Sequence, residues 1–204
     1  MIYIYPTDTS YALGCDARDS ASVKKIFEIK GRAESKTLPL IAADIAMARQ
    51  WCDLSGKAEE LAQKYWPGPL TLVLPLKKQT LKQSQILKPS TSAGRQVQDD
   101  EVQSDDLSSS VLIDGCAAIR VPDCETARNL SQEIGAPIVS TSANKSGDKN
   151  SYSVEEARAS LGDKMSMVDR IIDIGALEKK EPSTIVKIEG YEVRVLRKGK
   201  ISIL

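Results

Sequence analysis

The chain has 204 residues, 41% hydrophobic and 27% charged, which is typical of a globular protein with one substantial core. Its 28 Lys and Arg residues balance 28 Asp and Glu residues, so the net charge does not favour nucleic-acid binding, although a local basic patch is compatible with it. The sequence contains no histidine, which excludes histidine-based catalytic triads and histidine metal ligands.

The N-terminal third predicts strands and helices in mixed order. Two short apolar runs, residues 2–5 and 10–15, indicate strands. Ser20 is a suitable N-cap for a helix that extends to about residue 30, because apolar residues recur after it on successive turns. The following segments predict a strand at 38–43, helices at 44–52 and 55–66, and a buried strand at 70–76.

Residues 77–112 have a different character. They are rich in Gln, Ser and charged residues and have no sustained apolar period, which predicts a polar, mobile insertion. After it we expect a strand at 116–122, a helix at 123–133, and strands at 136–141, 169–175, 183–188 and 191–197. Ser153 and Glu156 fit a capping box that starts a helix ending near Leu161. These elements predict a single α/β domain over 1–204, with a mixed parallel and antiparallel sheet.

Neither of the two common glycine-rich phosphate loops is present in the sequence. Polar clusters beside apolar segments remain as candidates. In "YPTDTSYALG" (5–14), Thr9 offers a hydroxyl at a turn, and a plain hairpin corner explains this cluster equally well. In "KGRAESK" (30–36), Lys30, Arg32 and Lys36 follow a helix whose dipole favours cations in any case.

Two further clusters point in the same direction. "STSAN" (140–144) presents hydroxyls and backbone N–H groups that can surround an anion, or simply a helix cap. Arg120 and Arg197 lie within apolar strands, where an arginine requires either an acidic partner or a polar cavity. Together the clusters supply the cations and hydroxyls that bind phosphate, so the residues alone predict a nucleotide or phosphate pocket.

The sequence resembles the YrdC/Sua5 family, the threonylcarbamoyl-AMP synthases of tRNA modification. The stretches "YPTDTSYALG", "IFEIKGR", "WPGPLTLVLP", "AIRVPD", "PIVSTSANKSG", "PSTIV" and "VLRKG" occur in the family's order and cover most of the chain outside 77–112. The resemblance implies a twisted mixed sheet with flanking helices around a large basic cavity. It also implies a nucleotidyltransferase reaction in which L-threonine, bicarbonate or CO2, and ATP give threonylcarbamoyl-AMP and pyrophosphate.

The resemblance also assigns residues by position. Lys30, Arg32 and Lys36 are expected to be catalytic, with Arg32 and Lys36 facing the ATP phosphates and Lys30 beside them. The ATP site is expected to include Arg32, Lys36, Cys116, Ser142, Asn144, Asn150 and Arg197, although the family often has threonine where this chain has Cys116. The threonine site is expected to include Thr9, Arg120, Ser140 and Ser183. Magnesium is expected to arrive with ATP, and no dedicated protein metal site is expected.

The family's products and partners complete these expectations. A separate transferase complex is expected to move the threonylcarbamoyl group to adenosine 37 of tRNA, and direct tRNA binding is compatible with a basic cavity. A C-terminal domain found in the Sua5 branch is not recognised, which favours the short single-domain branch. The four cysteines form no C-x-x-C pair and nothing approaches a membrane span, so we expect reduced thiols and a cytoplasmic protein. The alternative is a non-catalytic RNA-binding or YciO-like module of the same fold.

Overall fold

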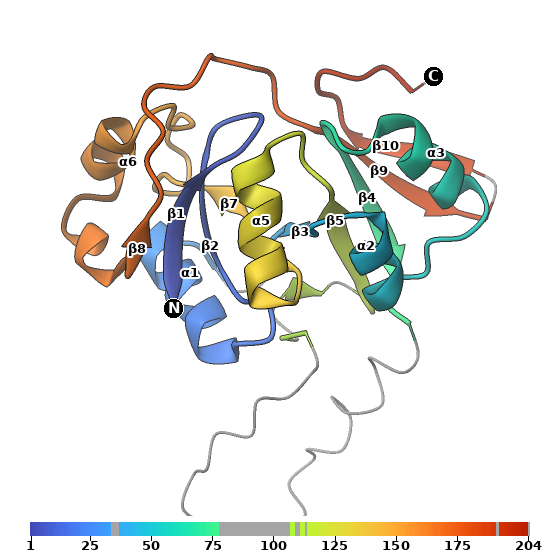
Figure 1. The fold of residues 1–204 in the computed structure, drawn as a ribbon, viewed down its shortest axis with the longest axis horizontal. Coiled ribbons are helices and arrows are strands. Elements are labelled where there is room, and N and C mark those ends of the chain that lie inside the picture. Colours follow the sequence, from blue (N-terminus) through green and yellow to red (C-terminus); the bar gives the residue numbers. More distant parts are fainter. Residues whose placement is uncertain (34–36, 78–106, 109–110, 113, 191, 204) are drawn as a thin grey trace, which may run out of the picture.

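The structure is a computed structural model that describes residues 1–33, 37–77, 107–108, 111–112, 114–190 and 192–203. Two sheets lie side by side with helices packed around them (Figure 1). The predicted α/β class with parallel and antiparallel pairs is confirmed. None of the helices in the described ranges is long and apolar enough to span a membrane.

The smaller sheet has four strands in the order β7-β2-β1-β8. It consists of β1 (Ile2–Pro6), β2 (Tyr11–Cys15), β7 (Thr141–Ser142) and β8 (Arg170–Ile171). Strands β1 and β2 form an antiparallel hairpin, whereas β8 pairs with β1 in parallel. Gly14 is required in β2, because a Cβ atom there would lie 2.0 Å from the carbonyl oxygen of Val139. The hairpin therefore packs closely against β6 (Ile138–Val139) of the larger sheet.

The larger sheet has six strands in the order β10-β9-β4-β5-β3-β6. Its members are β3 (Leu40–Ile41), β4 (Leu70–Pro75), β5 (Cys116–Arg120), β6 (Ile138–Val139), β9 (Thr184–Glu189) and β10 (Glu192–Arg197). Strand β3 is parallel to β5 and β4 is parallel to β9, while the other pairs are antiparallel. The alternating residues Leu70, Leu72 and Leu74 of β4, and Ala117 and Ile119 of β5, are buried in the core.

The helices are α1 (Ser20–Lys30), α2 (Ile45–Trp51), α3 (Lys57–Tyr65), α5 (Glu125–Ile134), α6 (Val154–Leu161) and the 3₁₀ helix η2 (Gly162–Met167). The predicted cap of α1 is wrong by one residue, because Asp19 accepts the backbone N–H of Ser22 at 2.9 Å. The predicted cap of α6 is confirmed, since Ser153 accepts the N–H of Glu156 at 3.2 Å. Short polar side chains at these positions satisfy N–H groups that the helix leaves unpaired.

The predicted strand at 136–141 is two strands in different sheets. Ile138–Val139 pairs with β3 of the larger sheet, and Thr141–Ser142 pairs with β2 of the smaller one. Ser140 lies at the crossing, where its backbone N–H donates to the carbonyl of Pro39 at 2.8 Å. Periodicity did not show this break, because both halves are similarly buried.

Helix α5 covers the junction between the sheets (Figure 1). A buried cluster contains Tyr5 and Ala12 from the smaller sheet, Ile41 and Ile138 from the larger sheet, and Ala127 and Leu130 from α5. The Tyr5 hydroxyl also donates to the carbonyl of Val139 at 3.0 Å. Apolar burial and a cross-sheet hydrogen bond therefore hold the sheets at a fixed distance.

Most of the predicted insertion at 77–112 lies outside the described residues. Among those described at its end, Leu107, Ser108 and Val111 are buried, and the N–H of Ser108 donates to the carbonyl of Ala17 at 2.8 Å. The chain is thus packed against the body of the protein several residues before β5.

Candidate functional site

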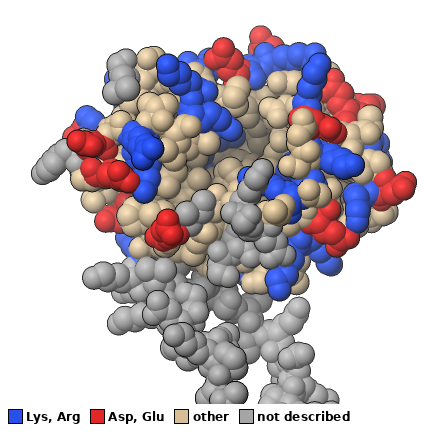
Figure 2. Space-filling model, turned by 180° about the vertical axis from the view of Figure 1, so that it is seen from behind, with Lys and Arg blue, Asp and Glu red and all other residues tan. Residues whose placement is uncertain are grey.

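A cavity of about 490 Å³ lies where the two sheets meet. It is open to the face shown in Figure 2, where Lys and Arg side chains flank a hollow. Its walls come from the β1–β2 turn, the segment after α1, and strands β3, β4, β5, β7, β9 and β10. The described charged residues that line it are Arg32, Asp114, Arg120, Lys187 and Arg197. Four cations and one carboxylate make the lining suited to anions.

The β1–β2 turn is held by its own hydroxyl groups. The Thr7 hydroxyl accepts N–H groups of Thr9 and Ser10, each at 3.2 Å, and donates to the carbonyl of Ser10 at 2.7 Å. The two threonine hydroxyls lie 3.1 Å apart. This turn therefore presents Thr9, which was assigned to the threonine site, to the cavity in a fixed orientation.

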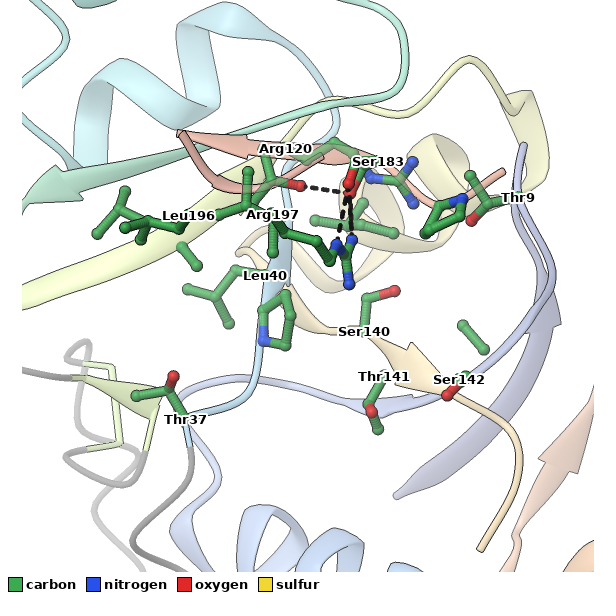
Figure 3. A pocket seen from close by; sticks show the side chains of 18 of the residues that line it. Thr9, Thr37, Leu40, Arg120, Ser140, Thr141, Ser142, Ser183, Leu196 and Arg197 are labelled. Atoms are coloured by element: carbon green, nitrogen blue, oxygen red, sulfur yellow. Dashed lines mark hydrogen bonds between the residues drawn. The ribbon is translucent and has the colours of Figure 1, made fainter. Parts of the chain in front are cut away.

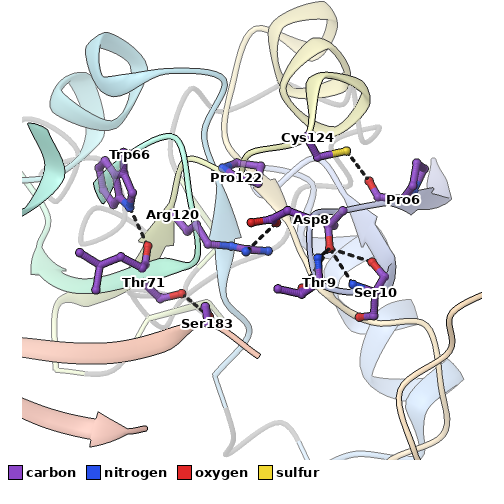
Figure 4. Close-up of polar contacts among 12 residues, drawn as sticks. Pro6, Asp8, Thr9, Ser10, Trp66, Thr71, Arg120, Pro122, Cys124 and Ser183 are labelled. Atoms are coloured by element: carbon purple, nitrogen blue, oxygen red, sulfur yellow. Dashed lines mark hydrogen bonds and ion pairs between the residues drawn. The ribbon is translucent and has the colours of Figure 1, made fainter. Parts of the chain in front are cut away.

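Arg120 ends strand β5 and lines the cavity. Its Nη1 donates to Asp8 Oδ1 at 2.8 Å, and both side chains are only 9% exposed (Figure 4). The sequence left open whether this arginine has an acidic partner or faces a polar cavity, and the structure shows both. The remaining N–H groups of the guanidinium leave donor capacity for a bound anion.

Arg197 lies near Arg120 at the same wall (Figure 3). Its Nε and Nη2 donate to the carbonyl of Ser183 at 3.1 and 2.8 Å, and Nη2 also donates to the Ser183 hydroxyl at 2.9 Å. The Ser183 hydroxyl lies 2.8 Å from that of Thr71. Burial, and then the charge of Arg120, lower the pKa of Arg197. The partners in these bonds are neutral, so its charge remains available to an anionic ligand.

Arg32 follows the C-terminus of α1 and lines another part of the cavity. Its Nη2 donates to the carbonyl of Thr37 at 3.1 Å. Its Nε is buried and finds no hydrogen-bond partner within the described part of the chain. Burial lowers the pKa of Arg32. A buried donor without a partner is costly, and a ligand oxygen would satisfy it.

Lys30, expected beside the phosphates, is buried behind residues that line the cavity. It is 2% exposed and is not among the described residues that line the cavity. Its Nζ donates to the carbonyls of Ser142 and Asn144 at 2.6 and 2.8 Å, and to Asn144 Oδ1 at 3.2 Å. Burial, and then the charge of Arg32, lower the pKa of Lys30 to about 8. Lys30 therefore stabilises the STSAN loop (residues 140–144) through hydrogen bonds without lining the cavity.

Asn144 has the same supporting role. It is buried, accepts a hydrogen bond from the Ser142 hydroxyl, and donates from Nδ2 to the carbonyl of Asp148 at 2.7 Å. It does not appear among the described lining residues, in contrast to the predicted ATP contact. Lys30 and Asn144 both hydrogen-bond to Ser142, which lines the cavity together with Asn150.

The other predicted site residues have mixed outcomes. Ser140, Ser183 and Cys116 line the cavity together with Thr9, Arg120 and Arg197. Lys36 lies outside the described residues. Cys116 is a partly exposed free thiol at the start of β5, and the other three cysteines are also free. The part of the chain that the structure describes contains no cluster of three or more His, Cys, Asp or Glu side chains placed to hold a metal ion.

Sequence reasoning missed several lining residues. Thr37, Asp114 and Lys187 line the cavity, and Asp8 supports it through Arg120. The sequence contains one signal for Asp8: it lies between two threonines in "PTDT", and its neighbour Thr9 is assigned to the threonine site. The others lie in segments with no distinctive local pattern.

Comparisons with known proteins show which family the chain resembles. The Sua5/YciO/YrdC family model, described as "Telomere recombination", matches residues 1–199. The threonylcarbamoyl-AMP synthase of Idiomarina loihiensis is 32% identical over 188 residues, which cover 91% of this chain and 86% of that protein.

Two solved structures are similar in fold and sequence. P. abyssi Sua5 complexed with L-threonine has a TM-score of 0.74 and 30% identity over 97% of this chain. The chain spans only half of that protein, 50% of its length. E. coli YciO has a TM-score of 0.69 and 25% identity, and the match covers 97% of this chain and 82% of that one.

Proposed function

The chain belongs to the Sua5/YciO/YrdC family, and from this premise we propose that it is a threonylcarbamoyl-AMP synthase. In this reaction L-threonine, bicarbonate or CO2, and ATP give threonylcarbamoyl-AMP and pyrophosphate. The enzyme is accordingly a nucleotidyltransferase. The observation that carries the proposal is one cavity lined by Arg32, Arg120 and Arg197 together with the hydroxyls of two separate loops.

The threonine site is proposed on the wall formed by the β1–β2 turn and the end of β5. Arg120 would bind the carboxylate, since its guanidinium is fixed on one side and lines the cavity on the other. Thr9, Ser140 and Ser183 would complete the site with hydroxyl groups. The P. abyssi relative, which was solved with L-threonine, supports an amino-acid site in this fold.

The ATP site is proposed along the rest of the cavity. Arg32 would bind phosphate oxygens through its unsatisfied Nε, with Lys36 beside it, and Arg197 would add a second uncompensated charge. Cys116 of β5, Ser142 of β7 and Asn150 of the segment before α6 would contact the nucleotide. Lys30 and Asn144 would act indirectly by holding the loop that carries Ser142.

The chemistry requires the protein to position reactants and stabilise charge. The threonine amine attacks CO2 to form a carbamate, and a carbamate oxygen attacks the α-phosphorus of ATP. Pyrophosphate leaves with the electron pair of the broken P–O bond. Arginines around the triphosphate offset its growing charge. Magnesium would arrive with ATP and neutralise phosphate oxygens.

The product defines the expected partners. A separate transferase would move the threonylcarbamoyl group to N6 of adenosine in tRNA, and direct tRNA binding at the Lys- and Arg-flanked opening is a further proposed interaction. We place the protein in the cytoplasm, where ATP, bicarbonate and tRNA are available.

The decisive experiment follows pyrophosphate release with ATP, magnesium, bicarbonate and L-threonine. We expect release only when all are present, and a product with the mass of threonylcarbamoyl-AMP. Release that continues without threonine or bicarbonate would contradict the proposal.

The alternative is a non-catalytic RNA-binding or YciO-like module. The threonine-bound Sua5 structure is more similar in sequence and fold than E. coli YciO, which supports the synthase. Salt-sensitive tRNA binding in a protein that forms no adenylate would favour the alternative instead.

A further inference from the structure

The Asp8–Arg120 ion pair connects the two sheets at the cavity wall. Asp8 belongs to the turn between β1 and β2 of the smaller sheet, whereas Arg120 is the last residue of β5 in the larger sheet. Arg120 lines the cavity, but Asp8 is not among the described residues that do so. Asp8 therefore contacts the guanidinium through Nη1 without itself being among the described lining residues, and Figure 4 shows this contact.

Asp8 is itself fixed by its neighbours. The Thr7 hydroxyl bonds to backbone groups on the far side of the turn, so the backbone on both sides of Asp8 is restrained. The same turn carries Thr9, which lines the cavity. One short segment thus sets the position of Thr9 directly and that of Arg120 through its carboxylate.

The orientation of Arg120 matters for binding a carboxylate. A guanidinium binds a carboxylate best through two parallel N–H donors, which requires a defined plane. Arg197 is close enough for the Arg120 charge to lower its pKa, so the two cations repel each other. The negative charge of Asp8 offsets this repulsion and fixes one edge of the Arg120 guanidinium.

We propose that Asp8 is a positioning residue that orients Arg120 toward the carboxylate of L-threonine and so sets the affinity for the amino acid without touching it. The inference rests on the proposed function. It goes further by distinguishing the residues that set the affinity for threonine from those that set the affinity for ATP, because Asp8 hydrogen-bonds to Arg120 and not to Arg32 or Arg197.

The test is Asp8→Asn, which keeps an oxygen acceptor but removes the charge. We expect the KM for L-threonine to rise about 10- to 100-fold, as for a misplaced binding group, and the KM for ATP to change less than about twofold. A side chain that only stabilised the fold would change both constants together or neither. An equal rise in both, or an unchanged KM for threonine, would overturn the inference.

Two further variants make the test robust. Asp8→Glu keeps the charge on a longer side chain, so it should recover part of the affinity for threonine that Asp8→Asn loses. If Asp8→Asn does not fold, Asp8→Glu should still raise the KM for threonine and leave the KM for ATP unchanged. Asp16→Asn is the matched control, since Asp16 pairs with Arg18 at 2.8 Å beyond the other end of β2. It should leave both KM values unchanged.

Binding of L-threonine measured by calorimetry separates this inference from the proposed function. If the wild type releases no pyrophosphate, the proposed function is wrong, and Asp8 is judged by the Kd for threonine alone. Weaker binding to Asp8→Asn would uphold its role, whereas equal Kd values, or no threonine binding to the wild type, would overturn it.

Discussion

Arg32 carries a buried guanidinium nitrogen that no described residue satisfies. Replacing it with methionine removes that unsatisfied donor and also one bond to Thr37, so we expect the free energy of unfolding to change by less than about 1 kcal/mol. We expect kcat/KM for ATP to fall about 10²- to 10³-fold, because a charge that stabilises phosphate is lost. Urea unfolding and pyrophosphate kinetics measure the two effects. A fall in stability that matches the loss of activity would contradict the role at the phosphates.

Lys30 should give the protein a specific pH dependence. Burial and the charge of Arg32 lower its pKa from 10.5 to about 8 in the folded protein. The unfolded chain therefore binds more protons between these two pH values, so the contribution of Lys30 to stability increases as the pH rises from about 8 to 10.5. Below about pH 8 the folded protein bears the full free-energy cost of burying the charged Lys30.

The measurement compares the wild type with Lys30→Met by urea unfolding across that range. We expect their difference in free energy of unfolding to shift in favour of the wild type by about 3 kcal/mol as the pH rises. Lys25→Met is the control on the same helix, because Lys25 is exposed and its substitution removes a lysine without disturbing the contacts to the STSAN loop. A constant difference for Lys30→Met would show that its charge is not destabilised by folding.

At the scale of the elements, Gly14 controls how closely β2 approaches β6. A Cβ atom at this position would lie 2.0 Å from the Val139 carbonyl oxygen and 3.0 Å from the Tyr5 ring. We therefore expect Gly14→Ala to lower the free energy of unfolding by about 3 kcal/mol and to weaken substrate binding, because Ser140 follows Val139 directly.

The matched control for this prediction is Gly56→Ala. Gly56 has a φ of 54°, and a Cβ atom added there would have no described atom within 4 Å, so only backbone strain is introduced. Because Gly56 has a ψ of −125°, outside the left-handed helical region, we expect that strain to cost about 1–3 kcal/mol. Chemical unfolding compares the two variants. If Gly14→Ala lowers the free energy of unfolding less than Gly56→Ala does, strands β2 and β6 can move apart at little cost.

At the scale of the whole molecule, the cavity lies between two sheets, so its ligands should hold them together. A ligand present at about 100 times its Kd stabilises the folded state by about 2.7 kcal/mol. For a chain of 204 residues this corresponds to a rise in Tm of roughly 5–10 °C. We expect ATP with magnesium, and separately L-threonine, to raise Tm in calorimetry. GTP at the same concentration tests base selectivity, and no shift with any nucleotide would contradict a nucleotide site in the cavity.

Local sequence patterns determined the elements. The apolar runs of β1, β2 and β4 and the amphipathic pattern of α1 predicted these elements to within two residues, because strands and helices depend on the spacing of apolar side chains. The resemblance to a family then supplied part of the cavity lining, and of the residues it assigned, the described ones line the cavity apart from Lys30 and Asn144.

Only the tertiary structure decided how these residues act. The break at Ser140, the pairing of Asp8 with Arg120, and the position of Lys30 behind the STSAN loop each join residues far apart in the chain. Such contacts depend on how the two sheets pack, and a local pattern contains no information about the partner. The sequence by itself therefore determined which side chains were available, while packing decided which of them face the cavity and which support it.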